Sequence, residues 1–285
     1  MRYAIASSFL VLTLIGNIGA GEICTPHALH KQLGTIDPNT GVGTNIGSFQ
    51  QPDLRLASGA FDNDGQFYSI ALLPGNTDSQ LARVDTSSGE ATLIGSSTGT
   101  FAVPLEVSDD GTMYTVGYLW PGVLGDNTNL FTVNKTDGQL TVVGPTDVTR
   151  PMDLAFDSQG TLWLASGGDD GNHLYTLDQA TGEATLKSTI TGVEEATEPG
   201  AEVMGIMFDE HDTLFGTAYY GANADFVSPL FSIDPASGKA TVIGNTGFVN
   251  PHGGDYRHVV PEPTSSVLSL LGCSICCLAR RRSRM

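Results

Sequence analysis

The chain has 285 residues, of which 31 are acidic and 13 are basic, and its net charge at pH 7 is −18. All 31 acidic residues, but only eight of the basic ones, lie between residues 21 and 263. Such an acidic body repels a phosphate backbone, so the composition excludes nucleic-acid binding. The 40% apolar content can form a hydrophobic core, and the 35 glycines favour many turns over long helices.

Residues 1–20 are predicted to be a secretory signal peptide. Arg2 supplies the positive start, an apolar run follows from Ala4 to Ile15, and small residues precede the expected cleavage after Ala20. The run is too short for a spanning helix, which needs about 20 apolar residues. We therefore expect the export translocon to be a partner of this protein.

The last 26 residues, 260–285, combine three unlike elements. A segment with two prolines forms an extended, accessible stretch. An apolar helix is predicted over residues 265–279, and an arginine cluster follows it and would stay on the cytoplasmic side of a bilayer. The helix is short for a membrane span, so we expect only transient anchoring in the membrane.

These three elements resemble the PEP-CTERM sorting signal of bacteria. The resemblance implies that an exosortase recognises the Pro-Glu-Pro segment, removes the tail and delivers the protein to the cell surface or the extracellular space. An ordinary C-terminal anchor is the alternative. The residues that carry the resemblance are Val260, Pro261, Glu262, Pro263, Gly272, Arg280, Arg281 and Arg282.

Cysteine usage is consistent with a removable tail. Three of the four cysteines, Cys273, Cys276 and Cys277, lie in the predicted tail helix. Only Cys24 remains in the exported body, so no internal disulfide is expected there.

A hairpin pattern recurs five times between residues 34 and 244. Each copy has an apolar strand, an Asp or Asn that opens a turn, and a Gly whose positive φ closes it. The closing glycines are Gly41, Gly89, Gly138, Gly182 and Gly238. Six residues later the copies have Gly47, Gly95, Gly144, Ser188 and Gly244.

A second hairpin separates consecutive copies, with turns at residues 62–65, 109–111, 157–160 and 209–212. The two hairpins together give four strands per unit, and the closing glycines are 44 to 56 residues apart. A four-stranded unit of this length is typical of a β-propeller blade.

We therefore predict an all-β fold over residues 21–259, a β-propeller of five four-stranded blades. Four blades are expected at residues 54–95, 103–144, 151–188 and 202–244. The N-terminal hairpin, Gly34–Gly47, has no hairpin before it, so a strand from Phe248–Val260 would have to complete a split blade and close the ring. The repeat also looks like that of exported bacterial propeller-like proteins. An open stack or a β-sandwich is the competing architecture.

The candidate ligand-binding residues lie in the loops between the second and third strands of the blades. These loops vary in length and are rich in aromatic and acidic side chains, which stack on sugar faces or accept hydroxyl groups. The same rings could instead cover the blade ends. The candidates are Tyr118, Trp120, Asp126, Asp169, Asp170, Tyr219, Tyr220 and Asp225.

No cofactor and no metal are predicted, and calcium is the one open alternative. Asp62-Asn63-Asp64-Gly65 and Asp109-Asp110-Gly111 resemble fragments of calcium loops, but the EF-hand spacing is not completed. Turn formation alone explains both segments. The histidines near the two ends, His27, His30, His252 and His258, follow no zinc-binding pattern.

The sequence favours a non-catalytic, exported protein of the cell surface or extracellular matrix, whose propeller is a binding module for polysaccharide. The alternative is an exported hydrolase or lyase acting on polysaccharide, with a site built from loop carboxylates. Enzymatic propellers gather such groups around the central axis, where Asp53, Arg150 and Glu202 would have to converge.

Overall fold

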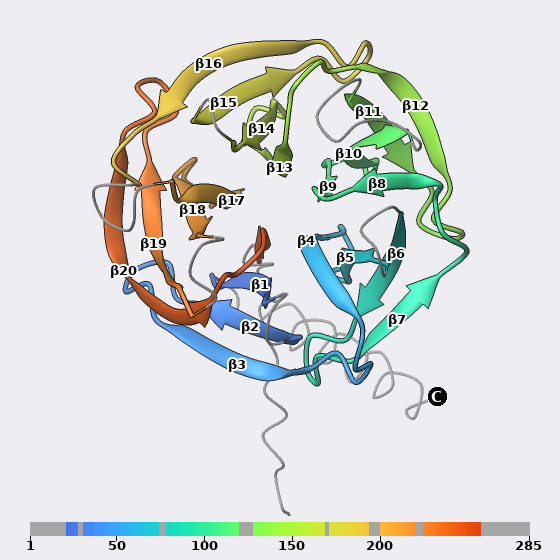
Figure 1. Cartoon of the computed structure of the whole chain (residues 1–285), viewed down its shortest axis with the longest axis horizontal. Coiled ribbons are helices and arrows are strands. Elements are labelled where there is room, and N and C mark those ends of the chain that lie inside the picture. The colour runs from blue at the N-terminus through green and yellow to red at the C-terminus, as the bar shows by residue number, and fades with distance from the viewer. Residues whose placement is uncertain are drawn as a thin grey trace, which may run out of the picture.

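Over the residues that it describes, the computed structural model places 21 strands in five sheets that surround a central axis (Figure 1). The predicted all-β, five-bladed propeller is therefore confirmed, and the open stack and the sandwich are excluded. The structure describes residues 21–27, 31–73, 78–119, 128–168, 171–193, 200–220 and 225–257. The predicted signal peptide, the sorting signal and both terminal helices lie outside these residues. None of the described segments forms a helix with the length and hydrophobicity that crossing a bilayer requires.

The strands of each blade are named a to d from the axis outward. Blade 1 contains β4 (Arg55–Phe61), β5 (Phe67–Leu72), β6 (Ser79–Val84) and β7 (Ala91–Ile94). Blade 2 contains β8 (Thr100–Ala102) and β9 (Glu106–Val107), which together form its strand a, then β10 (Met113–Leu119), β11 (Thr128–Val133) and β12 (Leu140–Pro145). Blade 3 contains β13 (Pro151–Phe156), β14 (Leu162–Ser166), β15 (Asn172–Leu177) and β16 (Ala184–Ile190). Blade 4 contains β17 (Glu202–Phe208), β18 (Leu214–Tyr219), β19 (Val227–Ile233) and β20 (Ala240–Val249).

The fifth, closing blade joins the two ends of the described chain. Its order from the axis is β21 (Asp255–Tyr256), β1 (Ile23–His27), β2 (Gln32–Ile36) and β3 (Gly43–Ser48). The prediction that a C-terminal strand completes this blade is confirmed. A single strand that the sequence did not predict, β1, precedes the N-terminal hairpin and pairs with β2 on one side and with β21 on the other. The blade therefore has four strands.

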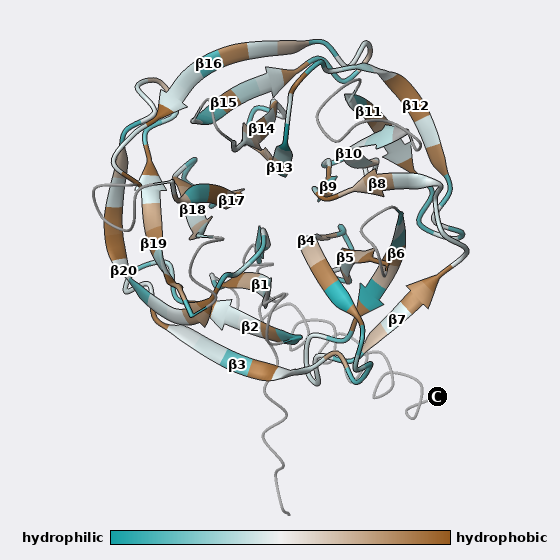
Figure 2. Cartoon of the chain, viewed as in Figure 1, coloured by the Kyte–Doolittle hydropathy of each residue, from teal (hydrophilic) through white to brown (hydrophobic). Residues whose placement is uncertain are grey.

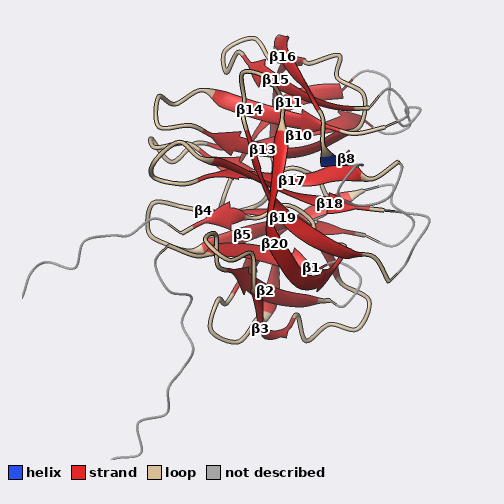
Figure 3. Cartoon of the chain, turned by 90° about the vertical axis from the view of Figure 1, so that its left-hand side faces the viewer, coloured by secondary structure: helices blue, strands red, loops and turns tan. Residues whose placement is uncertain are grey.

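The hydrophobic core is divided among the five junctions between neighbouring blades. Val203 and Phe231 of blade 4, for example, pack in one cluster with Leu174 of blade 3. The other clusters join the closing blade to blade 1, blade 1 to blade 2, blade 2 to blade 3, and blade 4 to the closing blade. Figure 2 shows the mixed hydropathy along the outer strands, and Figure 3 shows loops projecting on both sides of the strand layer. The core thus forms a continuous ring.

A second contact, which we call the rim contact, repeats at the outer edge of each junction. The turn between strands c and d of one blade lies against strand d of the preceding blade. At Gly144 of blade 2, an added Cβ would lie 2.0 Å from the carbonyl oxygen of Thr181 in blade 3. The same contact occurs at Gly47, Gly95 and Gly244. The recurring glycine is therefore required for a close approach between blades.

The rim contact also occurs where the ring closes, and it includes a side chain at the junction between blades 3 and 4. Gly244 of blade 4 lies against the turn of the closing blade, where its Cβ would be 2.0 Å from the carbonyl oxygen of Thr40. This contact closes the ring. Blade 3 has Ser188 instead of glycine, and the Ser188 hydroxyl donates a hydrogen bond to the carbonyl of Pro235, at 3.0 Å. A side chain is accommodated there because it bonds to the turn that it meets.

A group that we call the axial cluster joins the inner strands. Asp153 of β13 is fully buried and accepts hydrogen bonds from the Ser58 hydroxyl of blade 1, at 2.5 Å, and from the Ile206 amide of blade 4, at 2.9 Å. The Ser58 hydroxyl also accepts the amide of Leu105 in blade 2, at 3.1 Å. One carboxyl group therefore links four blades around the axis. Its burial raises the pKa of Asp153 well above the ordinary value of 3.8.

Substitution of Gly144 by Ala tests the rim contact. In a strand interior the change from Gly to Ala ordinarily stabilises a protein by about 0.5–1 kcal/mol. Here the turn of blade 3 must move, so we expect a loss of about 1–3 kcal/mol, measured by urea unfolding. Ser188→Ala is the control and should lose only one hydrogen bond, about 1 kcal/mol. A stabilised Gly144→Ala variant would contradict the rim contact.

Substitution of Asp153 by Asn tests the axial cluster through its pH dependence. Because the folded-state pKa of Asp153 is raised above 3.8, its contribution to stability is complete below that value and is lost as the pH rises through the folded-state pKa. The neutral Asn variant lacks this dependence. The difference in unfolding free energy, wild type minus variant, should therefore fall as the pH increases from 4 to 8. A difference in unfolding free energy that stays constant or increases with pH would contradict the raised folded-state pKa of Asp153.

Candidate binding face

All five chain segments that enter an inner strand do so through a residue with left-handed φ. These residues are Gln50 at 59°, Gly99 at 69°, Arg150 at 49°, Gly200 at 84° and Asn250 at 46°. In a propeller the connections from strand d to strand a share one face with the connections from b to c. We call the part of this face around the axis the mouth, and define it by Tyr118, Arg150, Glu202, Tyr219 and His252.

Arg150 and Glu202 form an ion pair at the mouth. The Arg150 Nη2 lies 2.6 Å from the Glu202 Oε2. Arg150 comes from the entry to blade 3 and Glu202 from the start of β17 in blade 4, so the pair spans two blades. Gly168 lies beneath the arginine, since a Cβ there would be 3.0 Å from the Arg150 Cδ. The Arg150 side chain is 48% exposed and that of Glu202 is 18% exposed, so the pair is accessible from the mouth.

Tyr118 belongs to β10 of the neighbouring blade 2. Its ring stacks on Phe101, its cross-strand partner, with centroids 5.7 Å apart and planes at 15°. Burial raises the pKa of the Tyr118 hydroxyl above 10, and the positive charge of Arg150 opposes that shift. At neutral pH Tyr118 is therefore an uncharged hydroxyl on a supported ring.

Tyr219 and His252 complete the mouth on the side of Glu202. Tyr219 is the cross-strand partner of Glu202, and its ring lies 6.0 Å from that of His252. Burial lowers the pKa of His252 to about 4, and the charge of Arg55 contributes to the shift. His252 is thus neutral at pH 7, and its buried Nδ1 has no hydrogen-bond partner in the described part of the chain.

Two of the predicted site residues have other surroundings. Tyr220 packs edge-on against Phe226, with centroids 6.1 Å apart, and its amide donates to the Asn250 side chain at 3.4 Å. Its ring therefore covers the end of blade 4, which was the alternative for the aromatic candidates. Asp225 is exposed in the turn before β19. Trp120, Asp126, Asp169 and Asp170 lie outside the described residues.

The enzyme alternative requires three residues to meet near the axis, and only two of them do. Arg150 and Glu202 meet as expected, but Asp53 is exposed and forms no hydrogen bond or ion pair with any described residue. The prediction that Asp53 joins them is not supported by these contacts. Sequence reasoning also missed His252 as a mouth residue, because it considered the histidines only as metal ligands.

The axial carboxyl groups were not identified from the sequence either. Besides Asp153, the inner strands carry Glu106, whose pKa is raised well above its ordinary value by burial and then by the charge of Asp255. Asp255 accepts the backbone amide of Phe61 at 2.8 Å and so joins the closing blade to blade 1. A signal existed, since Asp153 and Glu106 are the charged residues within otherwise apolar strand segments.

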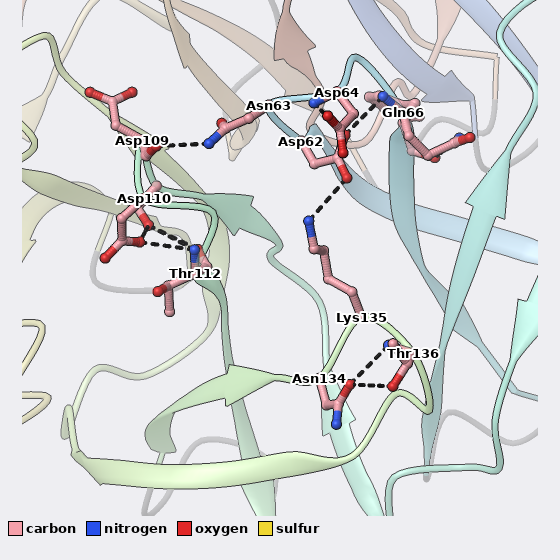
Figure 4. A network of polar contacts seen from close by, with 12 residues as sticks. Asp62, Asn63, Asp64, Gln66, Asp109, Asp110, Thr112, Asn134, Lys135 and Thr136 are labelled. Atoms are coloured by element: carbon pink, nitrogen blue, oxygen red, sulfur yellow. Dashed lines mark hydrogen bonds and ion pairs between the residues drawn. The ribbon is translucent and has the colours of Figure 1, made fainter.

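The segments that resemble calcium loops lie in the turns between strands a and b, away from the mouth. Figure 4 shows their contacts. Asp62 accepts the amides of Asp64 and Gln66, each at 3.0 Å, and pairs with Lys135 of blade 2 at 3.1 Å. The Asn63 amide donates to the Asp109 carbonyl of blade 2 at 2.7 Å. These side chains form turns and link two blades.

In the part of the chain that the structure describes, no three or more His, Cys, Asp or Glu side chains lie close enough together to hold a metal ion.

A polar pocket of about 490 Å³ lies beside the a–b and c–d turns of blade 1. Arg83, Asp85 and Glu90 line it. This pocket is separate from the mouth.

Solved structures resemble the chain in fold at low sequence identity. A protein of unknown function from Bacteroides caccae is 12% identical with a TM-score of 0.53, and the match covers 83% of this chain and 98% of that one. A nidogen/laminin complex gives 13% identity, a TM-score of 0.51, and coverage of 82% and 97%. A gluconolactonase from Xanthomonas campestris gives 14% identity, a TM-score of 0.46, and coverage of 84% and 78%. The two matches with TM-scores above 0.5 support the propeller fold alone.

The sequence comparisons are more specific about family than about activity. No curated protein matches the chain. A family model described as a repeat of unknown function, DUF6923, matches residues 23–169. This segment runs from β1 into blade 3 and comprises more than half of the chain. The chain therefore belongs to the family of the repeat of unknown function DUF6923.

Proposed function

We propose that this protein is an exported, non-catalytic binding module of the cell surface or extracellular matrix, and that its mouth binds polysaccharide. The observation that carries the proposal is the arrangement of Tyr118, Arg150 and Glu202. Blade 2 contributes an aromatic ring that Phe101 supports, and blades 3 and 4 contribute an accessible ion pair. Three blades thus contribute unlike groups to one surface.

The chemistry of these groups suits sugars. An aromatic face stacks on the apolar face of a pyranose ring, and Tyr118 of blade 2 and Tyr219 of blade 4 supply such rings. The guanidinium of Arg150 donates hydrogen bonds and the carboxylate of Glu202 accepts them, which matches sugar hydroxyl groups that do both. Loops that a rigid scaffold positions are where binding residues concentrate.

The proposed location outside the cell rests on the two ends of the sequence. Residues 1–20 would direct export through the translocon, and an exosortase would process the segment at residues 260–263. Membrane association would then last only until the tail is removed. The acidic body, with its few basic residues, would remain soluble through self-repulsion.

The alternative proposal is a hydrolase or lyase acting on polysaccharide. It is favoured by one observation, the convergence of Arg150 and Glu202 near the axis. In the enzyme, Glu202 would act on the substrate directly, and Arg150 would position it. Release of shortened products from a bound polysaccharide distinguishes this alternative from simple binding.

Tyr118→Ala and Tyr219→Ala test the proposed function. Each removes one stacking ring, so we expect polysaccharide binding to weaken about tenfold, or 1.4 kcal/mol. Binding is measured by affinity electrophoresis in gels that contain neutral or uronate polysaccharides, with reducing ends assayed in parallel. Arg83→Ala, in the pocket away from the mouth, is the control and should bind as the wild type does. Loss of binding in the control alone would place the ligand in that pocket and refute the mouth.

A further inference from the structure

We infer that the Arg150–Glu202 pair is the ligand-selecting clamp of the mouth, and that it selects uncharged sugars with adjacent hydroxyl groups over uronates. This inference rests on the proposed function and assigns a ligand class to it. It is carried by the contacts of the Arg150 guanidinium and by the charge of Glu202.

The backbone argument comes from the five equivalent entry residues. Gly99 and Gly200 adopt left-handed φ without steric cost, because they have no Cβ. Arg150, with φ of 49°, occupies the same position although an L side chain disfavours it. Gln50 and Asn250 adopt left-handed φ at their entries as well, so the backbone alone does not distinguish Arg150 from them. The side-chain contacts of Arg150 do.

The contacts of Arg150 show what the side chain does. It reaches across the junction to Glu202 at 2.6 Å, and Gly168, which has no Cβ, leaves room for it. The guanidinium forms no other hydrogen bond with the described residues. Since the side chain is 48% exposed, its other N–H groups are available to a ligand. A guanidinium has five such donors in a fixed plane.

The ligand class follows from placing these donors beside a carboxylate. Two adjacent sugar hydroxyl groups can accept from Arg150 and donate to Glu202 at once. A uronate carboxylate could accept from Arg150, but it could donate nothing to Glu202 and would compete with it for the guanidinium in a protein with a net charge of −18. The clamp is therefore suited to neutral sugars, with Tyr118 of the neighbouring blade as the stacking surface.

Arg150→Gly in the full-length protein is the central test, and Gln50→Gly is its matched control. Both replace a non-glycine residue at the left-handed entry position, and Gln50 is exposed. We expect both variants to keep or raise the midpoint of urea unfolding. Retardation by mannan in affinity gels should fall at least tenfold for Arg150→Gly and stay unchanged for Gln50→Gly. Glu202→Gln, which preserves shape but removes the charge, should also lose mannan binding and should gain relative affinity for alginate.

The outcomes separate the two proposals. Wild-type binding to mannan that Arg150→Gly leaves intact would overturn the clamp but not the mouth, provided that Tyr118→Ala reduces binding. Stronger wild-type binding to alginate than to mannan would overturn the assigned ligand class. Binding to neither polysaccharide would refute the clamp together with the proposed function. Loss of folding in Arg150→Gly but not in Gln50→Gly would show that Arg150 is structural and would likewise overturn the clamp.

Discussion

The fold depends on the close approach of each blade to its neighbour at the outer edge of the ring. A turn carbonyl lies where a Cβ would otherwise be, at Gly47, Gly95, Gly144 and Gly244. Only a residue without a side chain, or one such as Ser188 that bonds to the turn, satisfies this constraint. The same requirement at every junction fixes the relative placement of consecutive blades, and it includes the junction between Gly244 and Thr40 where the ring closes.

The regular ring explains why the mouth can be built from distant parts of the chain. Each inner strand begins after a left-handed residue, so that equivalent positions meet around the axis. Arg150 and Glu202 are 52 residues apart, yet they occupy neighbouring entries and form an ion pair. Beneath them the buried Asp153 joins the inner strands of four blades. The ion pair at the mouth is thus positioned by inner strands that Asp153 holds together. Precise recognition requires binding residues that rigid elements position in this way.

Much of the fold could be predicted because turn chemistry is local. An Asp or Asn followed by a Gly marks each hairpin within a few residues, and the interval between hairpins gives the blade. The strand β1 escaped detection because its segment, Ile23–His27, contains Pro26 and is not joined to β2 by such a turn. Its pairing with β21 is a long-range contact that no local pattern encodes.

The candidate site was predictable only in part, for the same reason. Loop composition identified Tyr118 and Tyr219 as mouth residues, but it could not show that Tyr220 packs against Phe226 instead. Likewise, Asp53 and Glu202 look equivalent in the sequence, and only the geometry between blades pairs one of them with Arg150. The family match and the fold similarities leave the activity open, so the argument for binding rests on these contacts.

Closure of the ring is the central claim, and a disulfide across the closing blade tests it most directly. Cys24 of β1 lies directly opposite Asp255 of β21, and opposed residues of antiparallel strands have Cα atoms about 4.5–5.5 Å apart, within reach of a disulfide. An Asp255→Cys variant in which Cys273, Cys276 and Cys277 are replaced by Ser, refolded in a glutathione buffer, should link Cys24 to the introduced thiol within one chain, as peptide mass mapping would detect. An Asp64→Cys variant on blade 1 serves as the control and should leave Cys24 reduced. Cross-linked dimers, or a reduced Cys24 in the Asp255→Cys variant, would contradict a closed five-bladed ring.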